Sequence, residues 1–214
     1  MREAMTKDLQ AGAMLGEGYR ALTRRLTDGF DLLRDEAVTL ARSYVQAANV
    51  RASQFTAEAN SDFIKGWRWC ATIELGYIQS GHGTCLRRAA LDGQEFTLGE
   101  GPEIPLHLKC RCVPIWGTPT WRELGIDMDE MEETMRPCMI REAKNIDEGG
   151  KRTILDSGLH QGGYGTWLMT QPDSVQLAAL GPGRMELLGS GAVDFEDLVD
   201  AKGNRRTLKE LRRR

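Results

Sequence analysis

The most informative stretch of this sequence runs from Thr84 to Trp116 and reads TCLRRAALDGQEFTLGEGPEIPLHLKCRCVPIW. At its centre, the pair Asp92-Gly93 predicts a tight turn, because both residue types tolerate the backbone angles that such a reversal demands. The turn should join a short element that ends near Ala89 to a strand over 95–98. Asp92 is therefore interpreted as a turn residue in preference to a catalytic carboxylate.

Two further strands are predicted on either side of this turn. Upstream, Trp67, Trp69, Ala71 and Ile73 alternate with more polar residues, which is the period of a half-buried strand. Downstream, residues 110–116 have the composition of a strand, and Pro114 restricts it to the edge of a sheet. Strands near 67–74, 94–98 and 110–116 should thus form a small antiparallel sheet.

The same stretch concentrates cysteine and histidine. Thiolates and imidazoles at short spacing are the ligands of tetrahedral zinc sites, although a zinc knuckle normally opens with C-x-x-C and the position three after Cys85 is Arg88. Three interpretations stay open: thiols packed as small apolar groups, a zinc site, or redox chemistry. The candidate zinc ligands are Cys85, His107, Cys110 and Cys112, with His82 as a further candidate. No other cofactor is predicted.

The N-terminal region, residues 1–62, is predicted to be a long helical arm. From Tyr19 to about Ala59, apolar residues recur at steps of three and four, which keeps them on one helix face. Gly29 interrupts the pattern and Asp31 can cap a restart, so the arm is either one helix or two stacked helices. Its apolar face should pack on the chain's own core or on a partner.

The remaining residues are predicted to be helical or linking. An acidic helix is expected over 126–139, a polar linker over 144–151 and a glycine-rich flexible segment around His160. A C-terminal helical wrap should follow over 161–214, with Gly181 as a helix stop and Asp194 as a cap. Candidate contacts to DNA or to an acidic partner lie in its basic tail: Arg205, Arg206, Lys209, Arg212, Arg213 and Arg214.

Composition narrows the class of protein. The net charge of −3 provides no overall positive field for binding DNA. No apolar run approaches the length of a membrane span, and no N-terminal signal segment is evident. The thiols are therefore expected to stay reduced, as in bacterial cytoplasm. The P-loop, the G-x-S-x-G elbow, the H-E-x-x-H motif and the dinucleotide fingerprint are all missing, so no enzyme is predicted.

Three linked motifs carry a resemblance to a known family. They are L-D-G-x-x-F at 91–96, H-x-x-C-R-C at 107–112 and T-L-x-E-L at 207–211. In this order they resemble the phage Mu F-like head morphogenesis family, the minor head proteins of tailed bacteriophages. The resemblance implies a non-enzymatic protein of the virion, assembled in the host bacterial cytoplasm and present in few copies near the portal. Implied partners are the portal protein, the major capsid protein or scaffold, and packaged DNA. The alternative is a zinc-stabilised nucleic-acid-binding or nuclease-like module.

The predicted fold class is α+β. We expect a long N-terminal helical arm, a small antiparallel sheet around the Cys/His cluster and a C-terminal helical wrap. The segments are the arm over 1–62, the Mu F-like core over 63–118, an acidic helical region over 119–160 and the wrap with its basic tail over 161–214.

Overall fold

The computed structural model describes residues 1–75, 84–130, 135–142 and 153–213. The fold is α+β, as predicted. The chain divides into two compact units, which are described separately below. The helical unit comprises Met1–Asn60 and Glu103–Arg111, and the sheet unit comprises Ser61–Pro102 and Cys112–Arg214. The first segment of the helical unit ends at Asn60, two residues before the predicted end of the arm. The helical unit also contains Glu103–Arg111, which the sequence analysis places in the Mu F-like core over 63–118.

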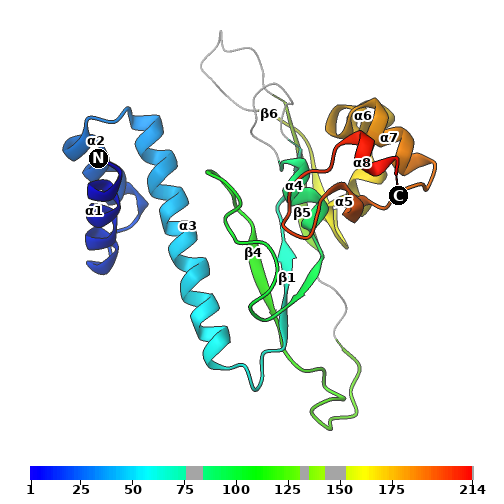
Figure 1. The fold of residues 1–214 in the computed structure, drawn as a ribbon, viewed down its shortest axis with the longest axis horizontal. Helices are drawn as coiled ribbons and strands as arrows, with labels where there is room; N and C mark the ends of the chain where they lie inside the picture. Colours follow the sequence, from blue (N-terminus) through cyan, green and yellow to red (C-terminus); the bar gives the residue numbers. More distant parts are fainter. Residues whose placement is uncertain (76–83, 131–134, 143–152, 214) are drawn as a thin grey trace. The chain divides into compact units, whose positions relative to one another are not determined.

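Three helices build the helical unit: α1 (Arg2–Met14), α2 (Tyr19–Phe30) and α3 (Arg34–Ala59). In Figure 1, α1 and α2 lie beside the first half of the long helix α3. The break between α2 and α3 falls where Asp31 adopts a left-handed backbone conformation, with φ of 52°. Of the two alternatives left open by the sequence, one helix or two, the structure has two. The predicted cap by Asp31 is wrong, because Asp31 ends α2, whereas Leu33 precedes α3 and makes no side-chain cap.

The interior of the helical unit is apolar and small. One cluster of buried apolar residues forms its core, namely Leu9, Leu22, Leu26, Ala37 and Ala41. Polar contacts join α2 to α1 and to the loop between them, since the Arg25 guanidinium donates to Glu17 at 2.6 Å and to Asp8 at 3.1 Å. Glu103–Arg111 joins this unit partly through the Lys109 N–H, which donates to Ser43 Oγ at 3.1 Å.

The first sheet of the sheet unit matches the prediction. Strands β3 (Glu95–Thr97), β1 (Gly66–Cys70) and β4 (Val113–Gly117) pair antiparallel in that order. Strand β4, which contains Pro114, lies at the edge as expected. Trp67 pairs with both Phe96 and Trp116 across the sheet, and its ring centroid lies 4.8 Å from that of Phe96. Aromatic packing therefore fixes the register at the centre of the sheet.

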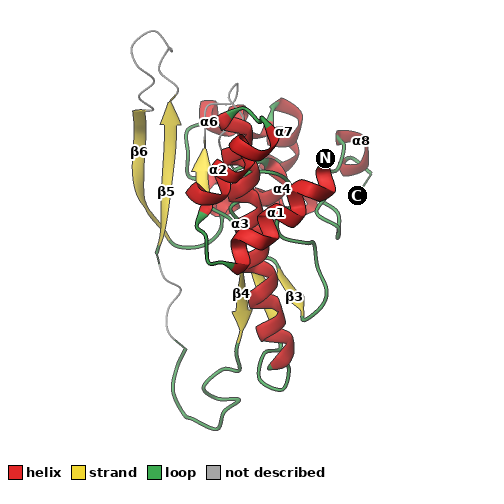
Figure 2. Cartoon of the chain, turned by 90° about the vertical axis from the view of Figure 1, so that its left-hand side faces the viewer, coloured by secondary structure: helices red, strands yellow, loops and turns green. Residues whose placement is uncertain are grey.

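A second sheet was not predicted. Strands β2 (Ile73–Leu75), β5 (Arg136–Glu142) and β6 (Thr153–His160) form it, with β2 parallel and β6 antiparallel to β5. Figure 2 shows β5 and β6 side by side as a long ribbon. The predicted strand over 67–74 is thus two strands that enter different sheets. They separate at Ala71, whose N–H and C=O bond to the side chains of Asp92 and Arg136 instead of to a neighbouring strand.

Two secondary-structure predictions in this region are wrong. The acidic helix over 126–139 is absent from the described part of that range, because 126–130 are irregular and 136–139 lie in β5. The methionine spacing over 128–135 favours a helix, but the residues that follow, 136–139, lie in β5 and pair with β6. The flexible segment around His160 is instead the end of β6, where Gly158 pairs with Cys138. The predicted linker over 144–151 lies outside the described residues.

Short helices complete the sheet unit. They are α4 (Leu86–Leu91), α5 (Tyr164–Met169), α6 (Asp173–Leu180), α7 (Pro182–Gly189), the 3₁₀ helix η2 (Phe195–Leu198) and α8 (Leu208–Leu211). Helix α6 ends at Gly181, whose φ is 74°, and Asp194 caps η2 with a reciprocal capping box, so both predictions for these residues are confirmed. The helices of 161–214 belong to the same unit as both sheets, so this wrap is not a separate domain.

The cap of helix α8 gives a pH-dependent prediction. The Thr207 N–H donates to the Glu210 carboxylate at 2.7 Å, and this bond lowers the pKa of Glu210. A depressed folded pKa means that the carboxylate stabilises the fold above its unfolded pKa, and that this contribution is lost as the pH falls through the folded value. Glu210→Gln should therefore be less stable than the wild type at pH 7, and the difference should shrink as the pH falls toward 3, as measured by chemical denaturation.

Thr207→Ala is the matched comparison for this cap. The Thr207 hydroxyl accepts from the Glu210 N–H at 3.3 Å, an interaction that does not titrate, and it also donates to the Glu210 carboxylate at 2.7 Å. Its removal should cost about 1 kcal/mol at pH 7, and the part of this cost that comes from the lost cap on the Glu210 N–H should persist at pH 3. A Glu210→Gln loss that persists unchanged at pH 3 would contradict the assignment.

Candidate functional site

The predicted cysteine and histidine ligands fall in both units. His107 and Cys110 belong to the helical unit, whereas Cys85 and Cys112 belong to the sheet unit. Cys110 and Cys112 are buried, with 3% and 0% of their surface exposed, and Cys85 is half-buried at the start of α4. His82 lies outside the described residues.

The side-chain arrangement does not form a metal centre within the described residues. There, no three His, Cys, Asp or Glu side chains are grouped so as to hold a metal ion. All five cysteines are described, and none is in a disulfide. The His107 Nδ1 atom lies 2.6 Å from the Leu108 carbonyl oxygen, and the Cys110 N–H donates to the His107 carbonyl. Zinc binding by Cys85, His107, Cys110 and Cys112 stays a prediction.

Asp92 occupies the most elaborate polar site in the described structure. Its side chain is fully buried and forms a two-pronged ion pair with Arg136. Arg136 Nη1 donates to Oδ2 at 2.9 Å, and Nη2 donates to Oδ1 at 3.0 Å. This parallel geometry is the strong form of an arginine–carboxylate contact. It joins the Asp92-Gly93 turn, where Gly93 has φ of 89°, to the first residue of β5.

Backbone groups complete the surroundings of the carboxylate. The Ala71 N–H donates to Oδ1 at 2.7 Å, and the Tyr164 N–H donates to Oδ2 at 2.6 Å. Each carboxylate oxygen thus receives two hydrogen bonds. Space is limited as well, since a Cβ atom added to Gly163 would lie 3.4 Å from Asp92 Oδ2. We call this arrangement of Asp92, Arg136, Ala71 and Tyr164 the Asp92 node.

The Asp92 node connects four segments of the sheet unit. They are the junction between β1 and β2, the turn after α4, the start of β5 and the start of α5. Arg136 also donates to the Gly162 carbonyl at 3.3 Å and to the Ala71 carbonyl. A carboxylate with both oxygens engaged and no exposed surface cannot reach a substrate, so the node is a structural element.

Sequence reasoning missed this node. Asp92 was correctly placed in a turn, but Arg136 lies 44 positions away, within a segment predicted to be an acidic helix. No spacing rule relates the two residues. The one available signal was the Asp92-Gly93 pair itself, which predicts a turn and says nothing of the buried partner.

An aromatic group lies next to the node. Tyr164 is 2% exposed, and its ring contacts those of Trp167 and Phe195, with centroids 5.3 and 6.2 Å away. Burial raises the pKa of Tyr164 well above its ordinary value, with a smaller opposing contribution from Arg88. The phenol therefore stays protonated and serves packing rather than proton transfer.

The predicted basic tail is exposed but anchored. Arg205, Lys209, Arg212 and Arg213 are exposed, Arg206 is half-buried, and Arg214 lies outside the described residues. Leu211 is 2% exposed and holds α8 on the sheet unit. Arg184 donates to the Arg206 carbonyl at 3.1 Å. The tail thus presents cations from a fixed element.

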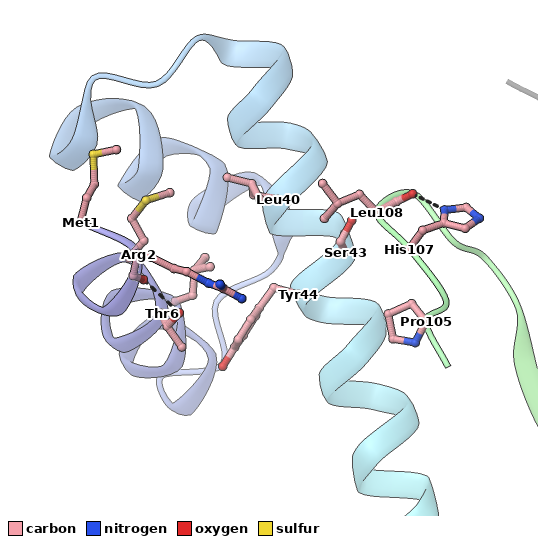
Figure 3. A pocket seen from close by; sticks show the side chains of 11 residues that line it. Met1, Arg2, Thr6, Leu40, Ser43, Tyr44, Pro105, His107 and Leu108 are labelled. Carbon is pink, nitrogen blue, oxygen red and sulfur yellow. Dashed lines mark hydrogen bonds between the residues drawn. The ribbon is translucent and has the colours of Figure 1, made fainter. Parts of the chain in front are cut away.

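The helical unit contains a cavity of about 480 Å³ (Figure 3). Its apolar lining consists of Met1, Met5, Leu9, Leu40, Tyr44, Pro105 and Leu108. Arg2 is the one residue of the lining with a permanent charge, and none of the described lining residues is acidic. A cavity of this size and character suits an apolar side chain or a small apolar ligand.

Comparison with models of known protein families, with curated proteins and with solved structures finds no match to this chain. Of the helices in the described residues, none combines the length and the apolar character needed to cross a lipid bilayer.

Proposed function

We propose that this chain is a structural minor head protein of a tailed bacteriophage, acting in procapsid or head assembly near the portal. The observation that carries the proposal is the Asp92 node. Asp92 belongs to the L-D-G-x-x-F motif on which the family resemblance rests. Of the fixed positions of that motif, it is the one whose side chain could act as a catalytic carboxylate. Its burial and four hydrogen bonds commit it to holding the fold together.

Other positions of the L-D-G-x-x-F and T-L-x-E-L motifs also have structural roles. Leu91 is fully buried, Phe96 packs on Trp67, and Thr207 with Glu210 caps α8. A motif whose members pack, turn and cap is typical of a protein selected for its shape. We therefore propose that the chain acts without catalytic turnover, through contacts with the portal protein, the major capsid protein or scaffold.

Location in the particle provides the test. Procapsids and mature heads of the phage that encodes this chain should contain it in few copies relative to the major capsid protein, as measured by quantitative mass spectrometry. A reconstruction of the head in which the portal vertex is not averaged with the other vertices should show density for this chain at the portal vertex. The host proteins found in a mock preparation are the control for adventitious binding.

The alternative nucleic-acid module predicts a different set of results. If the chain is such a module, it should be absent from every particle, the purified chain should contain zinc, and its affinity for DNA should fall steeply with salt concentration. Neutralising Arg205, Lys209, Arg212 and Arg213 would then reduce the salt dependence. That combination would replace the head-protein proposal, because a structural component must be present in the particle.

A further inference from the structure

The loop over 118–130 is an ordered segment that exposes apolar side chains. It follows β4 and projects past the end of that strand in both Figure 1 and Figure 2. Four large apolar residues on it are at least 36% exposed: Trp121, Leu124, Ile126 and Met128. Such a concentration of exposed apolar side chains marks an interaction surface.

Internal hydrogen bonds hold this loop in shape. The Trp121 N–H donates to the Glu130 carboxylate at 2.6 Å, and the Ile126 N–H donates to the Trp121 carbonyl at 2.8 Å. Arg122 and Asp129 form an ion pair at 2.8 Å across the loop. A loop fixed in this way loses little conformational entropy when it binds, which favours association.

The charge of the loop restricts what it can bind. Four carboxylates, those of Glu123, Asp127, Asp129 and Glu130, accompany a single arginine on the loop. A partner surface should therefore be apolar, free of acidic groups and bordered by positive charge. The cavity of the helical unit has a mostly apolar lining without acidic residues, and Arg2 in that lining supplies one positive charge.

We propose that the loop over 118–130 of one copy of this chain inserts Trp121 into the cavity of the helical unit of a second copy. The two surfaces match in apolar character, in opposite charge and in size, because a cavity of about 480 Å³ accommodates an indole ring. The contact joins different surfaces on the two copies, so it is heterologous and extends into rings or chains. The inference is independent of the proposed function, because it concerns only contacts between copies.

The test measures self-association of the full chain by sedimentation velocity, at concentrations from micromolar to submillimolar. The wild type should form concentration-dependent oligomers, and Trp121→Ala should weaken the association about 30-fold, as loss of a central aromatic anchor does. Phe55→Ala is the matched control, since Phe55 is an aromatic residue 56% exposed on α3, outside the loop and the cavity lining. It should associate like the wild type.

A mixing experiment separates this contact from symmetric pairing. Trp121→Ala keeps the cavity intact, and Leu108→Glu keeps the loop intact while placing a carboxylate in the cavity lining, at a residue 57% exposed. Each variant alone should associate weakly, but an equimolar mixture should form a one-to-one dimer and nothing larger. A wild type that stays monomeric, a Trp121→Ala variant that associates normally, or a mixture that stays monomeric would each overturn the proposal.

Discussion

Replacing Asp92 with alanine is expected to lower the free energy of unfolding of the sheet unit by about 3–5 kcal/mol. The substitution leaves the Arg136 guanidinium partly buried without its carboxylate, and it removes the acceptors of the Ala71 and Tyr164 N–H groups. Uncompensated buried charge is among the most destabilising changes that a single substitution produces. Denaturant titration, followed by tryptophan fluorescence, measures the loss.

Asp127→Ala is the control for this prediction. Asp127 is an exposed aspartate of the same unit, so its removal should change stability by no more than about 0.5 kcal/mol. A second variant, Arg136→Met, should be destabilised comparably to Asp92→Ala, since it leaves the buried carboxylate unpaired. If Asp92→Ala unfolds at the same denaturant concentration as the wild type, the structural role of the node is refuted.

The second large effect concerns the helical unit. Leu26→Ala should cost about 2–5 kcal/mol, because Leu26 is fully buried between helices and its truncation leaves a cavity in a small core. Loss of α-helical circular dichroism at a lower denaturant concentration is the expected observation. The helical unit draws its apolar interior from few residues, so one truncation removes a large share of it.

Leu33→Ala makes the same chemical change at a residue that is 73% exposed, at the start of α3. Its effect should stay within about 0.5 kcal/mol. Equal losses for the two variants would show that the packing of Leu26 is not what stabilises the three helices. A large loss for Leu26→Ala alone supports the described core.

Sequence patterns predicted the structural elements that depend only on neighbouring residues, such as turns and helix caps. The alternation from Trp67 to Ile73 identified a sheet strand, and Gly181 and Asp194 marked helix ends, because turns and caps depend on a few neighbouring residues. The break at Asp31 was visible for the same reason. These features need no information about distant parts of the chain.

The second sheet could not be predicted in this way. Residues 136–142 become a strand only because β2 and β6 supply hydrogen-bonding partners from remote parts of the sequence. The acidic residues and methionines that precede this strand favour a helix, so the predicted helix was extended wrongly to residue 139, into a segment that pairs with β2 and β6. The split of the predicted strand at Ala71 has the same origin, since Asp92 and Arg136 take its backbone hydrogen bonds.

Local sequence patterns were enough to predict the α+β class, the first antiparallel sheet and the turn at Asp92, whereas they left one helix or two open for the arm. The role of that turn depends on contacts between residues that are distant in the sequence. A carboxylate in a turn is ordinarily solvated, and it becomes the centre of the unit here because folding buries it against Arg136, 44 residues away. Burial makes the pairing obligatory, since an isolated charge inside a protein is far more costly than one in water.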